Sequence, residues 1–169
     1  MQIDPVTNAL LATVELEGAP CALASADGSL FVAWKALNGA DSVIARVDPV
    51  TGELIGRLDV PFSDIGRLSL TGPGELWAVN LWHPDEILRI DPEALVELPR
   101  IETEMLAAAM TVIGPYAWVS SGTATELLRI DTATAEITRI PLDVPSGDGI
   151  AGDETGIWTL GSFTQQILL

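Results

Sequence analysis

The stretch "ELLRIDTATAEITRIPL", residues 126–142, decides the fold because nearly the same phrase occurs elsewhere in the chain. An apolar strand ends at Asp131, the chain turns through the next few residues, and a second strand follows at once. The phrase recurs as "SVIARVDPVTGELIGRLDV" at 42–60 and, less clearly, as "EILRIDPEALVELP" at 86–99. Such a repeat predicts a fold assembled from several copies of one supersecondary unit.

Two markers give the length of that unit. The aspartate that opens the turn recurs at intervals of 44, 43 and 40 residues, at Asp4, Asp48, Asp91 and Asp131. An aromatic residue recurs at intervals of 46, 41 and 40 residues, at Phe31, Trp77, Trp118 and Trp158. The chain therefore contains four units of about 42 residues, each long enough for four short strands, which is the size of a propeller blade.

Local patterns agree with strands. "LIGRLDV" (54–60) alternates between two faces, and "LWAVN" (76–80) is apolar on both faces, as in a strand between neighbouring sheets. "ETEMLAAAMTVI" (102–113) has a helical composition, but its place in the repeat predicts a strand and its lead-in loop.

The turns also share their chemistry. From Asp48 to Gly52 the turn has a capping acceptor, a proline with a preset φ, and a glycine that is free to adopt a positive φ. Asn8 takes the place of that glycine in the first copy, and asparagine tolerates a positive φ. Leu95 and Ala135 stand there in the third and fourth copies, so we expect those two turns to differ.

The phrases "ARVDPVTGEL", "LRIDP" and "GELWAV" resemble the blades of streptogramin B lyase (virginiamycin B lyase) and of YVTN and NHL-type propellers. The resemblance covers essentially the whole chain and implies an all-β propeller array of four four-stranded blades. In that family the repeated phrase is the hairpin from the third to the outer fourth strand of a blade. The aromatic residue lies on the second strand, so Trp77, Trp118 and Trp158 are expected to be buried between blades.

The two ends of the chain read as halves of one strand. "QQILL" (165–169) stops where "RIDP" should follow, and "MQIDP" begins where "ILL" should precede. The interpretation is a single domain, 1–169, whose last blade is completed by strands from both termini. A homodimeric eight-bladed ring of two chains, or a fragment of a longer propeller, is favoured over a closed four-bladed monomer. An open half-ring is disfavoured because its end blades would expose apolar faces.

Composition and charge exclude some classes of binding partner. The net charge of −16 disfavours nucleic acid and anionic membranes, and no apolar run reaches the length of a membrane span. No signal peptide is recognisable, which indicates a cytoplasmic protein if the chain is complete. Cys21, the only cysteine, is expected to be a small buried apolar residue.

The candidate binding residues lie in loops that form the functional face of the family. Trp82, His83 and Asp85 occupy "NLWHPDE" between the second and third strands of one blade, and Lys35 begins the corresponding loop of the first. Asp64 and Asp148 lie in loops that join successive blades. An exposed tryptophan beside a histidine and an aspartate suits a ligand or protein contact, although Trp82 could instead fold over the blade edge.

No catalytic signature is present, and the resembling lyases use several histidines with a glutamate and a magnesium ion, whereas this chain has only His83. No catalytic residue, metal site or cofactor is therefore predicted, although convergent loop acids could bind a divalent cation. The predicted function is a scaffold that binds a protein or small molecule at the mouth of the central channel. The alternatives are a lyase-like metal-dependent enzyme and a half of a larger propeller that has no function of its own.

Overall fold

The computed structural model describes residues 1–26, 28–36, 41–61, 65–70, 74–80, 85–161 and 166–168, and all regular structure in these ranges is β. Three complete four-stranded antiparallel blades follow one another. The first is formed by β3 (Gly18–Ala26), β4 (Ser29–Ala36), β5 (Ser42–Val47) and β6 (Leu54–Val60). The second is formed by β7 (Ile65–Leu70), β8 (Leu76–Asn80), β9 (Glu86–Asp91) and β10 (Val96–Glu102). The third is formed by β11 (Ala109–Ile113), β12 (Tyr116–Ser120), β13 (Glu126–Asp131) and β14 (Ile137–Pro141).

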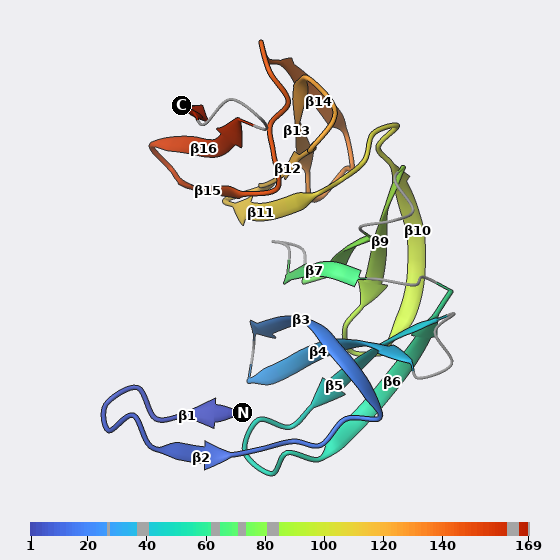
Figure 1. The fold of residues 1–169 in the computed structure, drawn as a ribbon. Helices are drawn as coiled ribbons and strands as arrows, with labels where there is room; N and C mark the ends of the chain where they lie inside the picture. The colour runs from blue at the N-terminus through green and yellow to red at the C-terminus, as the bar shows by residue number, and fades with distance from the viewer. Residues whose placement is uncertain are drawn as a thin grey trace.

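The remaining strands form two smaller sheets. A three-stranded sheet contains β15 (Ile150–Asp153), β16 (Gly156–Gly161) and β17 (Gln166–Leu168), and a hairpin contains β1 (Gln2–Ile3) and β2 (Leu10–Ala12). The predicted propeller array is confirmed, and its closing blade is present as these two pieces. They lie at opposite ends of an arc of blades (Figure 1), so one chain does not close into a four-bladed ring by itself.

The arc is ordered from the inside outwards. The first strands of neighbouring blades contact one another, β3 with β7, β7 with β11, and β11 with β15. The fourth strands, such as β6 and β10, lie on the outside of the arc (Figure 1). This is the radial order of a propeller, in which the first strands surround the channel.

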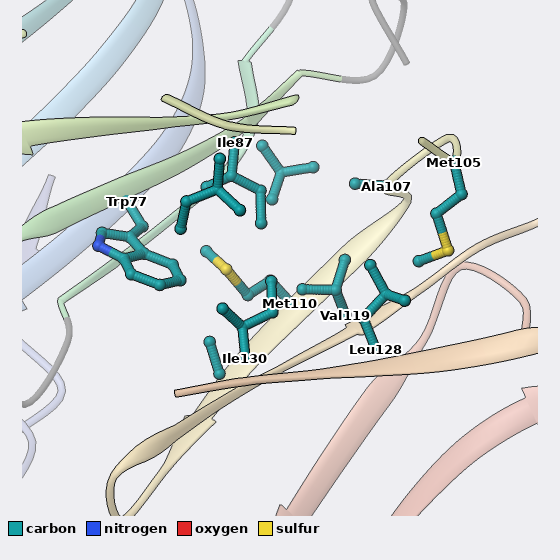
Figure 2. Packing of buried hydrophobic residues seen from close by; sticks show 11 residues of the cluster. Trp77, Ile87, Met105, Ala107, Met110, Val119, Leu128 and Ile130 are labelled. Carbon is teal, nitrogen blue, oxygen red and sulfur yellow. The ribbon is translucent and has the colours of Figure 1, made fainter. Parts of the chain in front are cut away.

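Two apolar cores hold the complete blades together, and the first of them lies between the first and second blades. The second core lies between the second and third blades, where the fully buried Trp77 packs with residues such as Met110 and Leu128 (Figure 2). The 102–113 segment is a strand end, a loop and β11, as its place in the repeat predicts. Met105 and Ala107 of that loop are buried in the same core, so the apolar composition serves packing rather than a helix.

The structure corrects two burial expectations. Trp77 is fully buried and Trp118 is half-buried, but 36% of Trp158 is exposed because no blade follows its sheet. Cys21 is also exposed, although its thiol donates a hydrogen bond to the carbonyl of Ala33 at 3.3 Å. Its strand, β3, lies at the end of the array, where no complete blade covers the sheet.

The expectation that the third and fourth turns differ is wrong. Gly52, Leu95 and Ala135 all have a positive φ, of 74°, 51° and 61°. In each turn the amide of this residue donates to the carbonyl of the aspartate, at 2.8 to 2.9 Å. A left-handed conformation costs a non-glycine residue about 1–2 kcal/mol. Leu95 and Ala135 offset this cost because their side chains pack against the two inter-blade cores.

The aspartates make these turns sensitive to acid. The carboxylate of Asp131 accepts amide hydrogen bonds from Thr134 and Ala133, both at 2.9 Å, and these bonds hold its pKa below the ordinary 3.8. The pKa values of Asp4, Asp48 and Asp91 are lowered by the same pair of backbone bonds. A carboxylate whose pKa falls on folding stabilises the native state above its unfolded pKa and loses this effect as the pH falls through the folded value.

We therefore expect the free energy of unfolding to fall steeply below about pH 4, which denaturant titrations across pH 7 to 2.5 would measure. Asp131→Asn, whose amide oxygen can still accept both bonds, should flatten the acid limb. Glu93→Gln, a matched loss of one charge from a side chain that accepts none of these bonds, should not. An acid limb that is equally steep in Asp131→Asn would contradict the assignment to the turn.

A second pair of positions recurs across the blades. An arginine on the third strand stands opposite the aromatic residue of the second: Arg46 opposite Phe31, Arg89 opposite Trp77, and Arg129 opposite Trp118. Each arginine engages the residue two positions before that aromatic, but by a different interaction. The partners are the hydroxyl of Ser29 at 2.9 Å, the carboxylate of Glu75 at 2.7 Å, and the ring of Tyr116, whose centroid is 4.7 Å from the guanidinium carbon.

Candidate binding face

The predicted face lies at the end of the blades where the loops between second and third strands meet the loops that join blades. The structure places Lys35 near the end of β4, Asp85 directly before β9, and Asp148 in the loop from β14 to β15. These three residues therefore lie on the same face but are spread along successive parts of the arc. Trp82, His83 and Asp64 lie outside the described residues.

The joining loop after the second blade is tied to the blade that it leaves. The amide of Thr103 donates to the carbonyl of Asp85 at 2.5 Å, and the Thr103 hydroxyl donates to the carbonyl of Met105 at 2.9 Å. Thr103 is fully buried, and Met105 is anchored in the second core. The backbone that carries Asp85 is therefore fixed from the side of the next blade.

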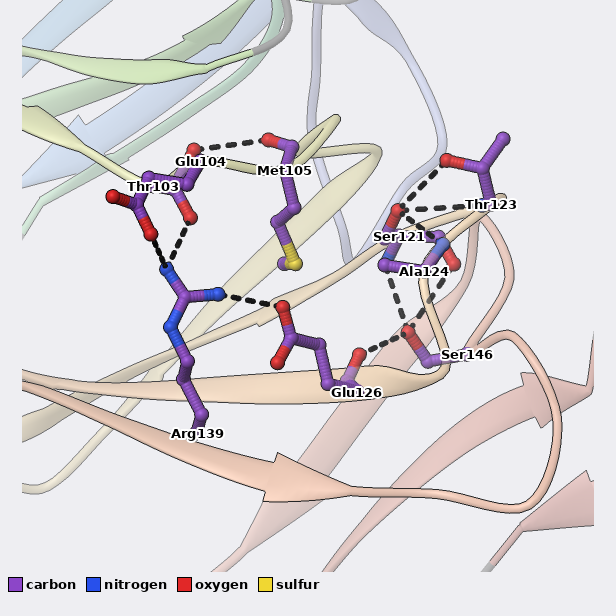
Figure 3. Close-up of polar contacts among 9 residues, drawn as sticks. All are labelled: Thr103, Glu104, Met105, Ser121, Thr123, Ala124, Glu126, Arg139 and Ser146. Carbon is purple, nitrogen blue, oxygen red and sulfur yellow. Dashed lines mark hydrogen bonds and ion pairs between the residues drawn. The ribbon is translucent and has the colours of Figure 1, made fainter.

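The joining loop after the third blade is fixed in the same way through two buried serines. The Ser121 amide donates to Oγ of Ser146 at 2.8 Å (Figure 3). The Gly147 amide donates to the Ser121 carbonyl at 2.9 Å. Oγ of Ser146 is also 3.2 Å from the carbonyl of Glu126, to which it donates. A side-chain oxygen of the neighbouring Asp148 lies 2.8 Å from where a β-carbon on Gly122 would stand, so Asp148 is close to the Ser121 loop.

Arg139, on β14 of the third blade, is bonded to the joining loop that follows the second blade. Its guanidinium donates to the carbonyl of Thr103 at 2.8 Å and forms ion pairs with Glu126 at 2.6 Å and Glu104 at 3.0 Å (Figure 3). Exposed ion pairs stabilise a protein by at most about 1 kcal/mol each. The main effect of Arg139 is therefore to hold the joining loop after the second blade against the third blade.

Sequence reasoning missed these four supporting residues: Thr103, Ser121, Ser146 and Arg139. A partial signal was present, because Ser121 accepts hydrogen bonds from the amides of Thr123 and Ala124 in the local turn typical of serine. The contacts of Ser146 and Arg139 reach across 25 and 36 residues of sequence, and no local pattern predicts such pairs.

The described residues contain no group of three or more histidine, cysteine, aspartate or glutamate side chains that could hold a metal ion. None of them forms a helix long and apolar enough to cross a bilayer.

Comparisons with known proteins agree on the fold. No family model matches the chain, and no curated protein matches it. Among solved structures, the Dos1 propeller has a TM-score of 0.74 and 8% identity, over 98% of this chain and 45% of that one. The RRP9 WD40 repeats have a TM-score of 0.65 and 13% identity, over 87% and 46%. The β-propeller domain of Cps50 (Swd1) from Myceliophteria thermophila has a TM-score of 0.66 and 15% identity, over 89% and 50%.

The class of protein is therefore settled: the chain has a β-propeller fold. It spans about half the length of the propellers that it matches. The identities are too low to show more than the fold, so the lyase-like type of propeller remains a prediction.

Proposed function

We propose that the chain is an interaction scaffold whose partner binds the loop face that carries Lys35, Asp85 and Asp148. The observation that carries the proposal is the fixation of this face by hydrogen bonds between loops at the second and at the third blade, and by the bond from Arg139 of the third blade to Thr103. A preorganised surface loses little conformational entropy on binding, which favours affinity.

The charge of the face indicates the chemistry of the partner. Asp85, Glu104, Asp143 and Asp148 are exposed there, in a chain whose net charge is −16. Complementary charge favours a protein with a basic contact surface, because opposite potentials speed association and select the partner. One structural neighbour is described as WD40 repeats, which is compatible with a scaffold but indicates no specific partner.

The test compares two variants with the same change in charge. Asp85→Lys together with Asp148→Lys alters the loop face, whereas Glu93→Lys together with Glu136→Lys alters exposed turns at the opposite end of the blades. Each chain is used to capture proteins from an extract of the source cells. We expect the loop-face variant to capture about tenfold less of the partner than the wild type, and the turn variant to capture as much as the wild type. Capture that survives the loop-face variant, or is lost equally with both variants, would refute the proposal.

A further inference from the structure

The two complete joints between blades share one arrangement. An aromatic residue on the second strand of a blade faces the next blade and shares a buried core with two residues of its second strand and one of its first. The sets are Phe31 with Leu76, Ala78 and Leu68 in the first joint, and Trp77 with Ala117, Val119 and Met110 in the second. The receiving residues on the first strands, Leu68 and Met110, are only 4% and 3% exposed.

Trp158, the last aromatic residue of the series, is not covered by a following blade among the described residues. Trp158 and Leu160 point to the same side of β16 because side chains alternate along a strand, and they are 36% and 51% exposed. Thr159, between them, is 5% exposed and donates its hydroxyl to the carbonyls of Ser146 and Gly149. One face of β16 is therefore packed on the preceding structure, and the other presents an apolar surface to solvent.

The first blade has the matching receptor, which is only partly covered: Val32 is 4% exposed and packs with Val14 and Leu16 of the same chain, whereas Leu23 is exposed. By strand register, Leu30, Val32 and Leu23 correspond to the receiving residues of the complete joints. Leu23 is 64% exposed, in contrast to its two counterparts. These three residues line a cavity of about 740 Å³ between the β1–β2 hairpin and the first blade. The cavity thus lies where the aromatic of a preceding blade would pack.

The backbone edges match in the same way. β17 pairs with residues 159–161 of β16, which leaves 156–158 without a pairing partner on that side among the described residues. In the third blade the equivalent residues 116–118 pair with 129–131. Gln2, Ile3 and Asp4 are the sequence counterparts of 129–131, and β1 pairs on one side only, with β2. The hairpin thus offers the missing part of the third strand and the whole fourth strand.

We infer that two copies of this chain close head to tail into one eight-bladed ring. The β1–β2 hairpin of each copy completes the β15–β17 sheet of the other, and Trp158 enters the cavity beside Leu23 of the partner subunit. A second copy is the occupant that fits, because each chain carries both halves of the joint at opposite ends of its arc (Figure 1) and spans about half of a known propeller. This inference is independent of the function proposed for the loop face.

Light scattering after size exclusion tests the pairing on the intact chain. We expect the wild-type mass to be twice 17.9 kDa. Leu23→Asp and Trp158→Asp should each weaken self-association about hundredfold or more, because each buries a charge in the joint. Leu160→Asp, at a more exposed position, gives the same readout if Trp158→Asp does not fold. Ile55→Asp, on the outer strand β6 and 56% exposed, is the matched control and should remain a dimer. A monomeric wild-type chain, or a dimer that survives the joint variants, would overturn the inference.

A covalent tandem separates ring closure from other dimers. Two copies joined from Leu169 to Met1 through a short glycine–serine linker should have the mass of one tandem chain and no tendency to associate further, since a closed ring has no free end. A tandem that assembles into larger species would show that the joints do not close, and would overturn the ring.

Discussion

Replacing Trp77 by alanine lowers the free energy of unfolding by about 3–5 kcal/mol, the range for truncation of a buried aromatic residue. The side chain is fully buried between the second and third blades, and it shares its core with Met110 and Leu128 (Figure 2). Truncation also removes the hydrogen bond that its indole Nε1–H donates to Glu75 at 2.9 Å. Urea denaturation of the wild type and the variant at one protein concentration measures the loss.

The control for this prediction is Leu54→Ala. Leu54 is 51% exposed on an outer strand, so its truncation should change the free energy of unfolding by no more than about 0.5 kcal/mol. If Trp77→Ala costs as little as Leu54→Ala, the packing between these two blades does not stabilise the fold and the arc of blades is not a cooperative unit.

Replacing Gly147 by alanine destabilises the protein by about 2–5 kcal/mol, from a left-handed backbone and from overpacking together. Its φ is +71°, and a β-carbon would stand 2.3 Å from the carbonyl oxygen of Leu160, which cannot move away as a flexible side chain could. The amide of Gly147 also joins its loop to Ser121. We therefore expect a lower melting temperature and faster amide hydrogen exchange in the 142–149 loop.

Gly114→Ala separates the two causes. Gly114 has a φ of +55° but no atom within 4 Å of the position of a β-carbon, so only the backbone cost of about 1–2 kcal/mol applies. If the two substitutions lower the free energy of unfolding equally, the close approach to Leu160 does not contribute to the cost of Gly147→Ala.

Repetition made most of the fold predictable. Each blade copies the same spacing of aspartate and aromatic residue, so evidence accumulates over four units where one alone would be ambiguous. The 102–113 segment shows the benefit, since its period predicted a strand against its helical composition. The turn at Leu95 shows the limit, because the absence of glycine suggested another conformation, whereas the hydrogen bonds to Asp91 and the packing of the leucine keep the same one.

The binding face was less predictable than the blades. Sequence placed Lys35, Asp85 and Asp148 on one face because it located the loops within the repeat. It did not find Ser146 or Arg139, since their hydrogen-bond partners lie 25 and 36 residues away in the sequence and no local pattern encodes such pairs. The exposure of Trp158 was missed for a related reason: the repeat marks an aromatic as a core residue without revealing whether the same chain supplies its neighbour.

The recurring arginines tolerate different partners in the three complete blades. Arg46, Arg89 and Arg129 keep one identity, while their partners are a hydroxyl, a carboxylate and an aromatic ring. A guanidinium group can serve all three, because its edge donates hydrogen bonds and its flat face stacks on rings. A mutation of the partner therefore exchanges one favourable contact for another, whereas a mutation of the arginine leaves nothing in exchange. One versatile residue in each complete blade thus accepts a different neighbour without a change in the shape of the blade.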